Sequence, residues 1–167
     1  MATILRAPDR LTAAQKKTTV TAYLAGPFDD GAKGAGSWRD DVIEAYEDLD
    51  ITIIDPRSER WPELEVGSPG RRGAYDWQCA AAFEADVVIV WVPDGPPDPT
   101  ALLILGYLGA KRSNAKRGSS VVVGGDGCGG LALLFAQNQR LFPAGAELAE
   151  VIRLGRLQLD AAATAKA

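Results

Sequence analysis

Four short runs of apolar residues divide the chain at regular intervals, and we interpret each run as a buried β-strand. The runs are rich in β-branched residues and almost uninterrupted by polar ones, which is typical of parallel strands covered on both faces. Their starts lie about 32 residues apart, the length of a strand–helix–strand unit. The predicted strands are residues 19–25, 51–55, 86–93 and 119–124.

The segments after these runs have the three- and four-residue apolar spacing of amphipathic helices. Ser37 and Asp40 make a capping-box-like start to the first of them. Segment 100–111 is apolar nearly all round, so we expect it to be buried within the domain or against another subunit. The predicted helices are residues 37–49, 73–85, 100–111, 131–141 and 147–159.

The alternation of strands and helices predicts an α/β fold with a doubly wound parallel sheet and right-handed crossovers. The length of 167 residues is suited to a single domain. We expect this domain to span residues 18–160, with a flexible N-terminal segment at 1–17 and a flexible tail at 161–167.

Composition and charge exclude several classes of function. Hydrophobic residues make up 47% of the chain and charged residues 24%, as in an ordinary globular protein. The net charge of −4 argues against a nucleic-acid polymer as partner, because an acidic surface repels phosphates. The chain has no histidine, which excludes Ser-His-Asp and Cys-His catalysis and imidazole-based metal sites.

The cysteines and the apolar runs bear on location. Cys79 and Cys128 form no C-x-x-C pair and are too few for a disulfide scaffold, so we expect the reducing cytoplasm. Residues 1–17 carry four basic side chains but no apolar core of a signal peptide. No apolar run approaches the roughly 18 residues of a membrane span, so we expect no membrane partner.

Ligands of a doubly wound sheet bind beyond the carboxyl ends of its strands, so the polar chemistry is expected in the four loops there. The glycines after the first strand do not have the G-x-G-x-x-G spacing, and no GK[ST] follows, so we expect no nucleotide cofactor. Asp29 and Asp30 faintly suggest a phosphoacceptor domain, but the fourth strand does not end in the lysine that this chemistry requires. We expect no metal ion either.

Two residues near these ends have both a structural and a functional interpretation. Asp98 before Pro99 is a standard helix N-cap, and it is also a carboxylate at the mouth of the expected site. Tyr23 lies in a strand, where a tyrosine is more often part of the core than catalytic.

Five motifs then follow one another at a characteristic spacing. They are Tyr23-Leu-Ala-Gly-Pro27, Ser37-Trp-Arg39, Tyr75-Asp-Trp-Gln78, Ala85-Asp-Val-Val-Ile-Val-Trp-Val-Pro93 and Leu105-Gly-Tyr107. Together they resemble the nucleoside 2-deoxyribosyltransferase family over residues 18–140. The resemblance implies a flavodoxin-like sheet, a homo-oligomer, and cleavage of the N-glycosidic bond of a (deoxy)nucleoside. Relatives of the family hydrolyse nucleoside 5′-monophosphates instead.

The resemblance also assigns expected roles to single residues. Tyr23 and Asp98 fall on catalytic-site positions of the family, whereas Ile104 falls on the position of its catalytic glutamate. Gln78 falls on the acidic residue that handles the base, and Ala132 on an asparagine that the neighbouring subunit contributes.

Further contacts with the ligand are expected around the first and third strand ends. Gly26, Pro27 and Asp94 are expected to line the pocket beside Gln78. Arg39, together with Arg57 or Arg71, could meet a 5′-phosphate, although a surface salt bridge explains each arginine equally well.

Ile104 changes the expected activity. Cleavage of the bond passes through an oxocarbenium-like state that a carboxylate stabilises, and isoleucine cannot do this. We therefore expect a nucleoside- or nucleotide-binding protein whose activity is lost or much reduced. Two alternatives remain open: a divergent N-glycosidase that uses Asp98, with Asp94 four residues away, and a structural assembly protein that uses segment 100–111 as an interface.

Overall fold

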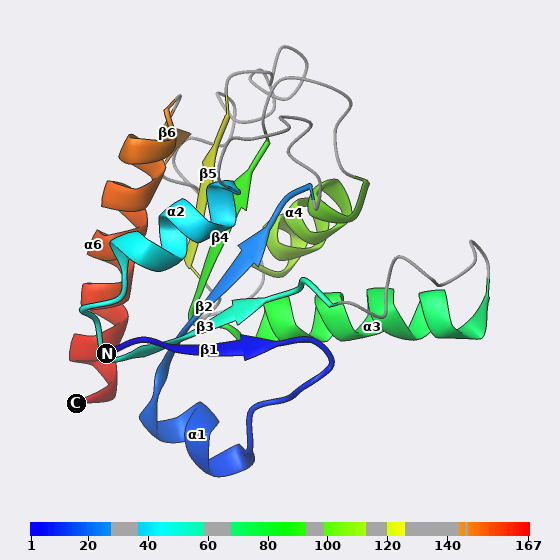
Figure 1. The fold of residues 1–167 in the computed structure, drawn as a ribbon, viewed down its shortest axis with the longest axis horizontal. Helices are drawn as coiled ribbons and strands as arrows, with labels where there is room; N and C mark the ends of the chain where they lie inside the picture. The colour runs from blue at the N-terminus through cyan, green and yellow to red at the C-terminus, as the bar shows by residue number, and fades with distance from the viewer. Residues whose placement is uncertain (28–36, 59–67, 93–98, 113–119, 126–143, 146) are drawn as a thin grey trace.

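The computed structural model describes residues 1–27, 37–58, 68–92, 99–112, 120–125, 144–145 and 147–167, and within these residues six parallel strands form one sheet (Figure 1). The order across the sheet is β1-β3-β2-β4-β5-β6. The strands are β1 (Thr3–Arg6), β2 (Val20–Ala25), β3 (Ile51–Asp55), β4 (Val87–Trp91), β5 (Ser120–Gly124) and β6 (Ala144–Gly145).

The strand order confirms the flavodoxin-like fold. Strands β3-β2-β4-β5-β6 repeat the flavodoxin order 2-1-3-4-5, and β1 adds one parallel strand beyond β3. The direction of winding changes between β2 and β4, which is the position where flavodoxin-like sheets open a crevice at the carboxyl ends of the strands. The residues that follow β2 and β4 therefore frame the candidate site.

Helices cover both faces of the sheet and enclose two apolar layers. Figure 1 shows α2 (Trp38–Ala45) and α6 (Leu148–Lys166) on one face, and α3 (Pro69–Glu84) and α4 (Pro99–Arg112) on the other. Successive residues of a strand point to opposite faces. Tyr23 and Ala25 of β2 accordingly belong to the layer with α3 and α4, whereas Ala22 and Leu24 belong to the layer with α2 and α6.

The four predicted strands and four of the predicted helices are present, with boundaries that shift by a few residues. The largest shift at a helix start is in α3, which begins at Pro69 because Ser68 accepts a hydrogen bond from the backbone of Arg71. Proline is favourable in that first turn, where its missing N–H has no helical partner. The fifth predicted helix, residues 131–141, lies outside the described residues.

Both ends of the chain contain regular secondary structure, and the flexibility expected of residues 1–17 and 161–167 stays a prediction. In residues 1–17 the structure has β1 and the start of α1 (Ala13–Thr18), with Arg6 in register opposite Asp55 of β3. The sequence did not indicate β1 because it is an edge strand with mostly exposed residues. The alanine-rich tail continues α6 to Lys166, as its high helix propensity favours. None of the described helices is long and apolar enough to cross a membrane.

Candidate functional site

The turn after β2 approaches its neighbours so closely that it requires glycine. Gly26 has φ +156°, and a Cβ atom there would lie 2.5 Å from the carbonyl oxygen of Trp91 and 2.8 Å from Cζ2 of Trp38. Any side chain at Gly26 would therefore displace either the end of β4 or the first turn of α2. The backbone at Gly26 thus lies very close to the end of β4, at the point where the winding of the sheet reverses.

A second glycine makes the same kind of contact on the other side of β4. Gly125 has φ +140°, and a Cβ atom there would overlap the carbonyl group of Val92. The backbone N–H of Val92 donates a hydrogen bond to the carbonyl of Gly124 at 2.7 Å. The ends of β4 and β5 are therefore held together by their backbone.

Arg39 of α2 forms hydrogen bonds with the turn that follows β2. Its side chain is fully buried, and its guanidinium donates hydrogen bonds to the carbonyl oxygens of Gly26, at 2.6 Å, and Pro27. The guanidinium also lies over the ring of Trp38, 4.5 Å from its centroid. Both terminal nitrogens of Arg39 thus donate to the backbone of the turn, so Arg39 stabilises the turn. Its predicted contact with a ligand phosphate stays a prediction.

Asp55, at the end of β3, balances the charge of Arg39. Its carboxylate is fully buried, and Oδ1 lies 3.9 Å from Nε of Arg39. Arg57 donates to the same carboxylate twice, from its backbone N–H to Oδ1 at 3.0 Å and from Nε to Oδ2 at 2.8 Å. Two arginines therefore compensate one buried negative charge, as burial of an ion requires.

The same cluster extends to the surface through Arg6 and Asp40. Arg6 Nε lies 3.9 Å from Asp55 Oδ2, and Arg57 donates from Nη2 to Asp40 Oδ1 at 2.6 Å. The hydrogen bond from Arg57 lowers the pKa of Asp40 below its ordinary value, and the same bond raises the pKa of Arg57. Arg6 was missed as a candidate because only the pairing of β1 with β3 brings it to this edge of the sheet.

The face covered by α3 and α4 holds three of the residues singled out from the sequence. Tyr23 on β2, Gln78 on α3 and Ile104 on α4 are 0%, 5% and 1% exposed. Tyr23 and Ile104 belong to one buried apolar cluster, and the three elements that carry these residues contact one another. Asp94, Asp98 and Ala132 lie outside the described residues, so their predicted places beside this group stay predictions.

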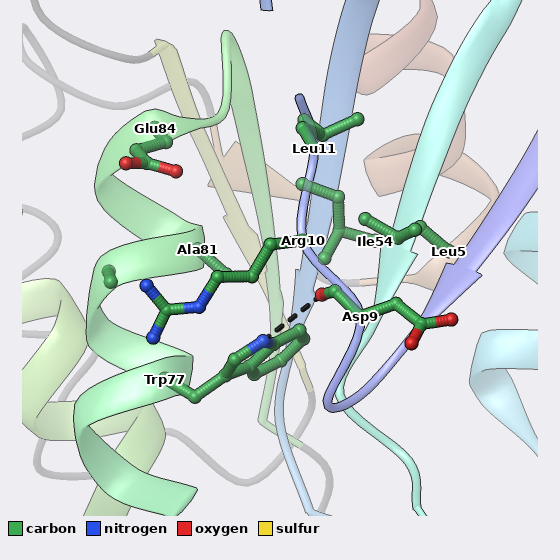
Figure 2. A pocket seen from close by; sticks show the side chains of 9 residues that line it. Leu5, Asp9, Arg10, Leu11, Ile54, Trp77, Ala81 and Glu84 are labelled. Carbon is green, nitrogen blue, oxygen red and sulfur yellow. Dashed lines mark hydrogen bonds between the residues drawn. The ribbon is translucent and has the colours of Figure 1, made fainter. Parts of the chain in front are cut away.

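A small pocket lies between the N-terminal segment and α3 (Figure 2). Trp77 of α3 forms part of its wall and donates from Nε1 to the carbonyl oxygen of Asp9 at 3.1 Å. None of the residues predicted to bind a ligand lines this pocket. The lining residues are Leu5, Asp9, Arg10, Leu11, Ile54, Trp77, Ala80, Ala81 and Glu84.

Metal binding finds no support in the part of the chain that the structure describes. No three cysteine, aspartate or glutamate side chains come together there in the arrangement of a metal site. Two of the described carboxylates at the carboxyl edge, Asp40 and Asp55, are paired with arginine.

The sequence of the chain matches that of a known family over most of the region just described. The family described as nucleoside 2-deoxyribosyltransferase like matches residues 19–117, which is more than half of the chain. The matched region runs from the start of β2 past α4 and contains Tyr23, Arg39, Gln78 and Ile104. No curated protein matches the chain.

Proposed function

Because the chain belongs to the nucleoside 2-deoxyribosyltransferase-like family, we propose that it binds a nucleoside or nucleotide and has lost most or all glycosidic cleavage. The observation that carries the second half of this proposal is Ile104. This residue occupies the position at which the resemblance places the catalytic glutamate, and it lies 1% exposed on α4. The proposed binding place is the crevice at the carboxyl ends of β2 and β4.

The chemistry of the reaction explains why Ile104 matters. When the base leaves, positive charge develops on the sugar, and a carboxylate captures or stabilises it. An aliphatic side chain offers neither a lone pair nor a negative charge. Loss of a nucleophile raises the barrier by several kcal/mol in enzymes of this kind, which is a rate decrease of several orders of magnitude.

The surroundings of Ile104 support the same conclusion. The described part of its cluster contains aliphatic residues of α4 and of strands β4 and β5, such as Leu105, Leu108, Val90 and Val123. A carboxylate in such surroundings would be poorly solvated, and its pKa would rise. The surroundings of this position therefore suit an apolar side chain better than a carboxylate.

We propose that Gln78 recognises the nucleobase through hydrogen bonds. Its amide has both a donor and an acceptor and can pair with the edge of a nucleobase, as an acidic residue also can through its oxygens. Gln78 is 5% exposed on α3, the helix that covers Tyr23 of β2. We propose that Gly26, Pro27 and Asp94 complete the wall of this pocket.

A second candidate function is that of a divergent N-glycosidase that uses Asp98. It is favoured by Tyr23, which the chain keeps in β2, two residues before the strand ends, in the same buried cluster as residues of α4. In this version water attacks the sugar, with Asp98 and Asp94 in place of the missing glutamate.

We also propose that the protein is a homo-oligomer. Leu103 on α4 is 58% exposed and Tyr75 on α3 is 39% exposed, and these two helices contact each other. We propose that these exposed apolar side chains take part in the contact between subunits. Light scattering should give a mass above that of the monomer, and Leu103→Lys should lower it, whereas a monomeric wild type would contradict the proposal.

Binding is tested by titrating the protein with a panel of nucleosides and their 5′-monophosphates while NMR or tryptophan fluorescence is recorded. We expect saturable binding of at least one compound, weakened in Gln78→Ala. The matched control is Gln158→Ala, a partly exposed glutamine on α6, which covers the opposite face of the sheet from α3. No saturation by any compound would contradict the proposal.

A further inference from the structure

Two arginines lie at the surface where β1 and β3 end side by side. Arg6, the last residue of β1, is in register with Asp55, the last residue of β3, and Arg57 follows two positions later. The side chain of Arg6 is 64% exposed and that of Arg57 is 25% exposed. Parallel strands end at one edge, so both guanidinium groups face the edge of the sheet at which ligands bind.

The cluster around them carries a surplus of positive charge. Arg6, Arg39 and Arg57 contribute three positive charges, and Asp40 and Asp55 contribute two negative ones, which leaves one positive charge. This surplus occurs in a chain with a net charge of −4. Since Arg39 and Asp55 are both fully buried and compensate each other, the surplus belongs to the accessible Arg6 and Arg57.

The buried carboxylate also fixes how these two side chains are presented. Asp55 Oδ2 accepts from Nε of Arg57 at 2.8 Å and lies 3.9 Å from Nε of Arg6. A guanidinium has five N–H donors in a planar fork, so an interaction through Nε leaves its terminal nitrogens for other acceptors. Asp55 therefore orients the fork of Arg57 through Nε and attracts the charge of the nearby Arg6.

Asp40 already illustrates the kind of group to which these terminal nitrogens donate hydrogen bonds. Its carboxylate accepts from Nη2 of Arg57 at 2.6 Å, yet its side chain is 56% exposed. An exposed carboxylate can turn into solvent at little cost, because surface ion pairs are weak. Asp40 is thus an exchangeable anion at this place.

We propose that Arg6 and Arg57 bind the phosphate group of a small molecule, which takes the place of Asp40. A phosphate dianion can accept from two guanidinium groups at once, whereas Asp40 brings one negative charge to one of them. This site would take free phosphate or a phosphate monoester, and it does not depend on the proposed nucleoside-binding crevice. If both sites exist, they lie two strands apart along the carboxyl edge of the sheet, with the ends of β3 and β2 between them.

The test is calorimetric titration of inorganic phosphate into the folded protein at low ionic strength. We expect saturable binding that Arg6→Ala weakens about tenfold, the loss of one charge-assisted contact. Arg57→Lys keeps the charge and the pairing with Asp55 but loses the fork, so it should weaken binding as well. Asp40→Asn removes the competing carboxylate and should tighten binding. Circular dichroism confirms that each variant is folded.

Arg153→Ala is the matched control, because Arg153 is an exposed arginine that pairs with Glu150 on α6. It should bind phosphate as the wild type does. The inference is overturned if phosphate does not bind, or if Arg6→Ala and Arg57→Lys both bind it with wild-type affinity. It is likewise overturned if Asp40→Asn weakens binding.

A parallel titration with a deoxynucleoside and its 5′-monophosphate separates this inference from the proposed function. Binding of phosphate without binding of either compound would refute the nucleoside crevice and leave the phosphate site intact. Binding of the monophosphate that is insensitive to Arg6→Ala and Arg57→Lys, with no binding of free phosphate, would refute the phosphate site and leave the crevice intact.

Discussion

The carboxylate of Asp55 and the guanidinium of Arg39 lie 3.9 Å apart, and neither side chain is exposed to solvent. Each charge compensates the other, and Arg39 adds two hydrogen bonds to the turn after β2. The end of β3 is thereby linked through α2 to the end of β2. Removing one member of a buried pair leaves an uncompensated charge, so the pair is expected to be costly to break.

Arg39→Met should lower the free energy of unfolding by about 3 kcal/mol, because Asp55 then retains only Arg57 and Arg6 as partners. Arg39→Lys should cost less, since it restores the charge without the planar fork. Urea denaturation measures both, and Arg72→Met is the control because Arg72 is exposed on α3. Equal losses in Arg39→Met and Arg72→Met would show that the buried pair contributes nothing.

Tyr46 should make the protein sensitive to alkali. Burial raises the pKa of its phenol above the ordinary value of 10.0, so the folded state holds it neutral while the unfolded state ionises it. The stability from the neutral phenol is complete below pH 10 and is lost as the pH rises above 10. The urea midpoint should therefore fall less steeply above pH 10 in Tyr46→Phe than in the wild type.

Near neutral pH the same variant should lose about 1 kcal/mol, the usual value of a buried hydrogen bond. The bond in question runs from the Tyr46 hydroxyl to the carbonyl oxygen of Ile152 in α6, at 2.7 Å. Parallel alkaline curves for the two proteins would contradict the proposed role of the phenol.

Two glycines in helices should respond in opposite directions to alanine. A Cβ atom at Gly155 of α6 would overlap the Tyr46 hydroxyl and lie 3.1 Å from Cδ1 of Ile89, so Gly155→Ala should destabilise by about 1–3 kcal/mol. A Cβ atom at Gly73 of α3 meets nothing within 4 Å, so Gly73→Ala should stabilise by about 0.5–1 kcal/mol through helix propensity. Thermal unfolding measures both. Stabilisation by Gly155→Ala would mean that α6 packs less closely on α2 than described.

Ile104→Glu and Leu103→Glu form a matched pair of variants on α4. Ile104 is 1% exposed and Leu103 is 58% exposed. At protein concentrations where only the monomer is present, Ile104→Glu should lower the free energy of unfolding by about 2–4 kcal/mol, because a carboxylate enters an apolar cluster. Under the same conditions Leu103→Glu should change it by less than about 0.5 kcal/mol, because its effect on the proposed subunit contact is then absent. Ile104→Glu should also bring a trace of base release if the substrate still fits. Equal stability of the two variants would place Ile104 outside the buried cluster.

The sequence patterns revealed the strands in which nearly every residue is buried. Strands β2 to β5 are covered on both faces, so each is a continuous apolar run that stands out against the polar helices. The edge strand β1 has exposed residues at three of its four positions, and therefore carried no such signal. α6 was recognised from its apolar spacing, but its last turns are alanine-rich and lack the apolar periodicity that would have marked them as helical.

In the candidate site, the sequence predicted only those contacts whose two residues lie within one short motif. The segment from Ser37 to Asp40 indicated a capping-box-like helix start, and Ser37 caps α2 by accepting a hydrogen bond from the backbone N–H of Arg39. The contact of Arg39 with the backbone of Gly26 and with Asp55 depends on how three elements come together in space, which local patterns do not contain. The same holds for Arg6, because its place beside Asp55 follows from the pairing of β1 with β3.

The central claim is that this chain keeps the family's fold and lacks its bond-cleaving activity, and base release by the wild-type protein tests it most directly. Nucleosides, deoxynucleosides and their 5′-monophosphates are incubated with the protein, and the free base is quantified by chromatography against a protein-free control. We predict slow release or none above that control, because Ile104 supplies no carboxylate to the developing charge on the sugar. Rapid release of base with many turnovers per protein molecule would contradict the account. Its loss in Asp98→Ala would then assign the reaction to Asp98, and its survival would place the catalytic carboxylate at another residue.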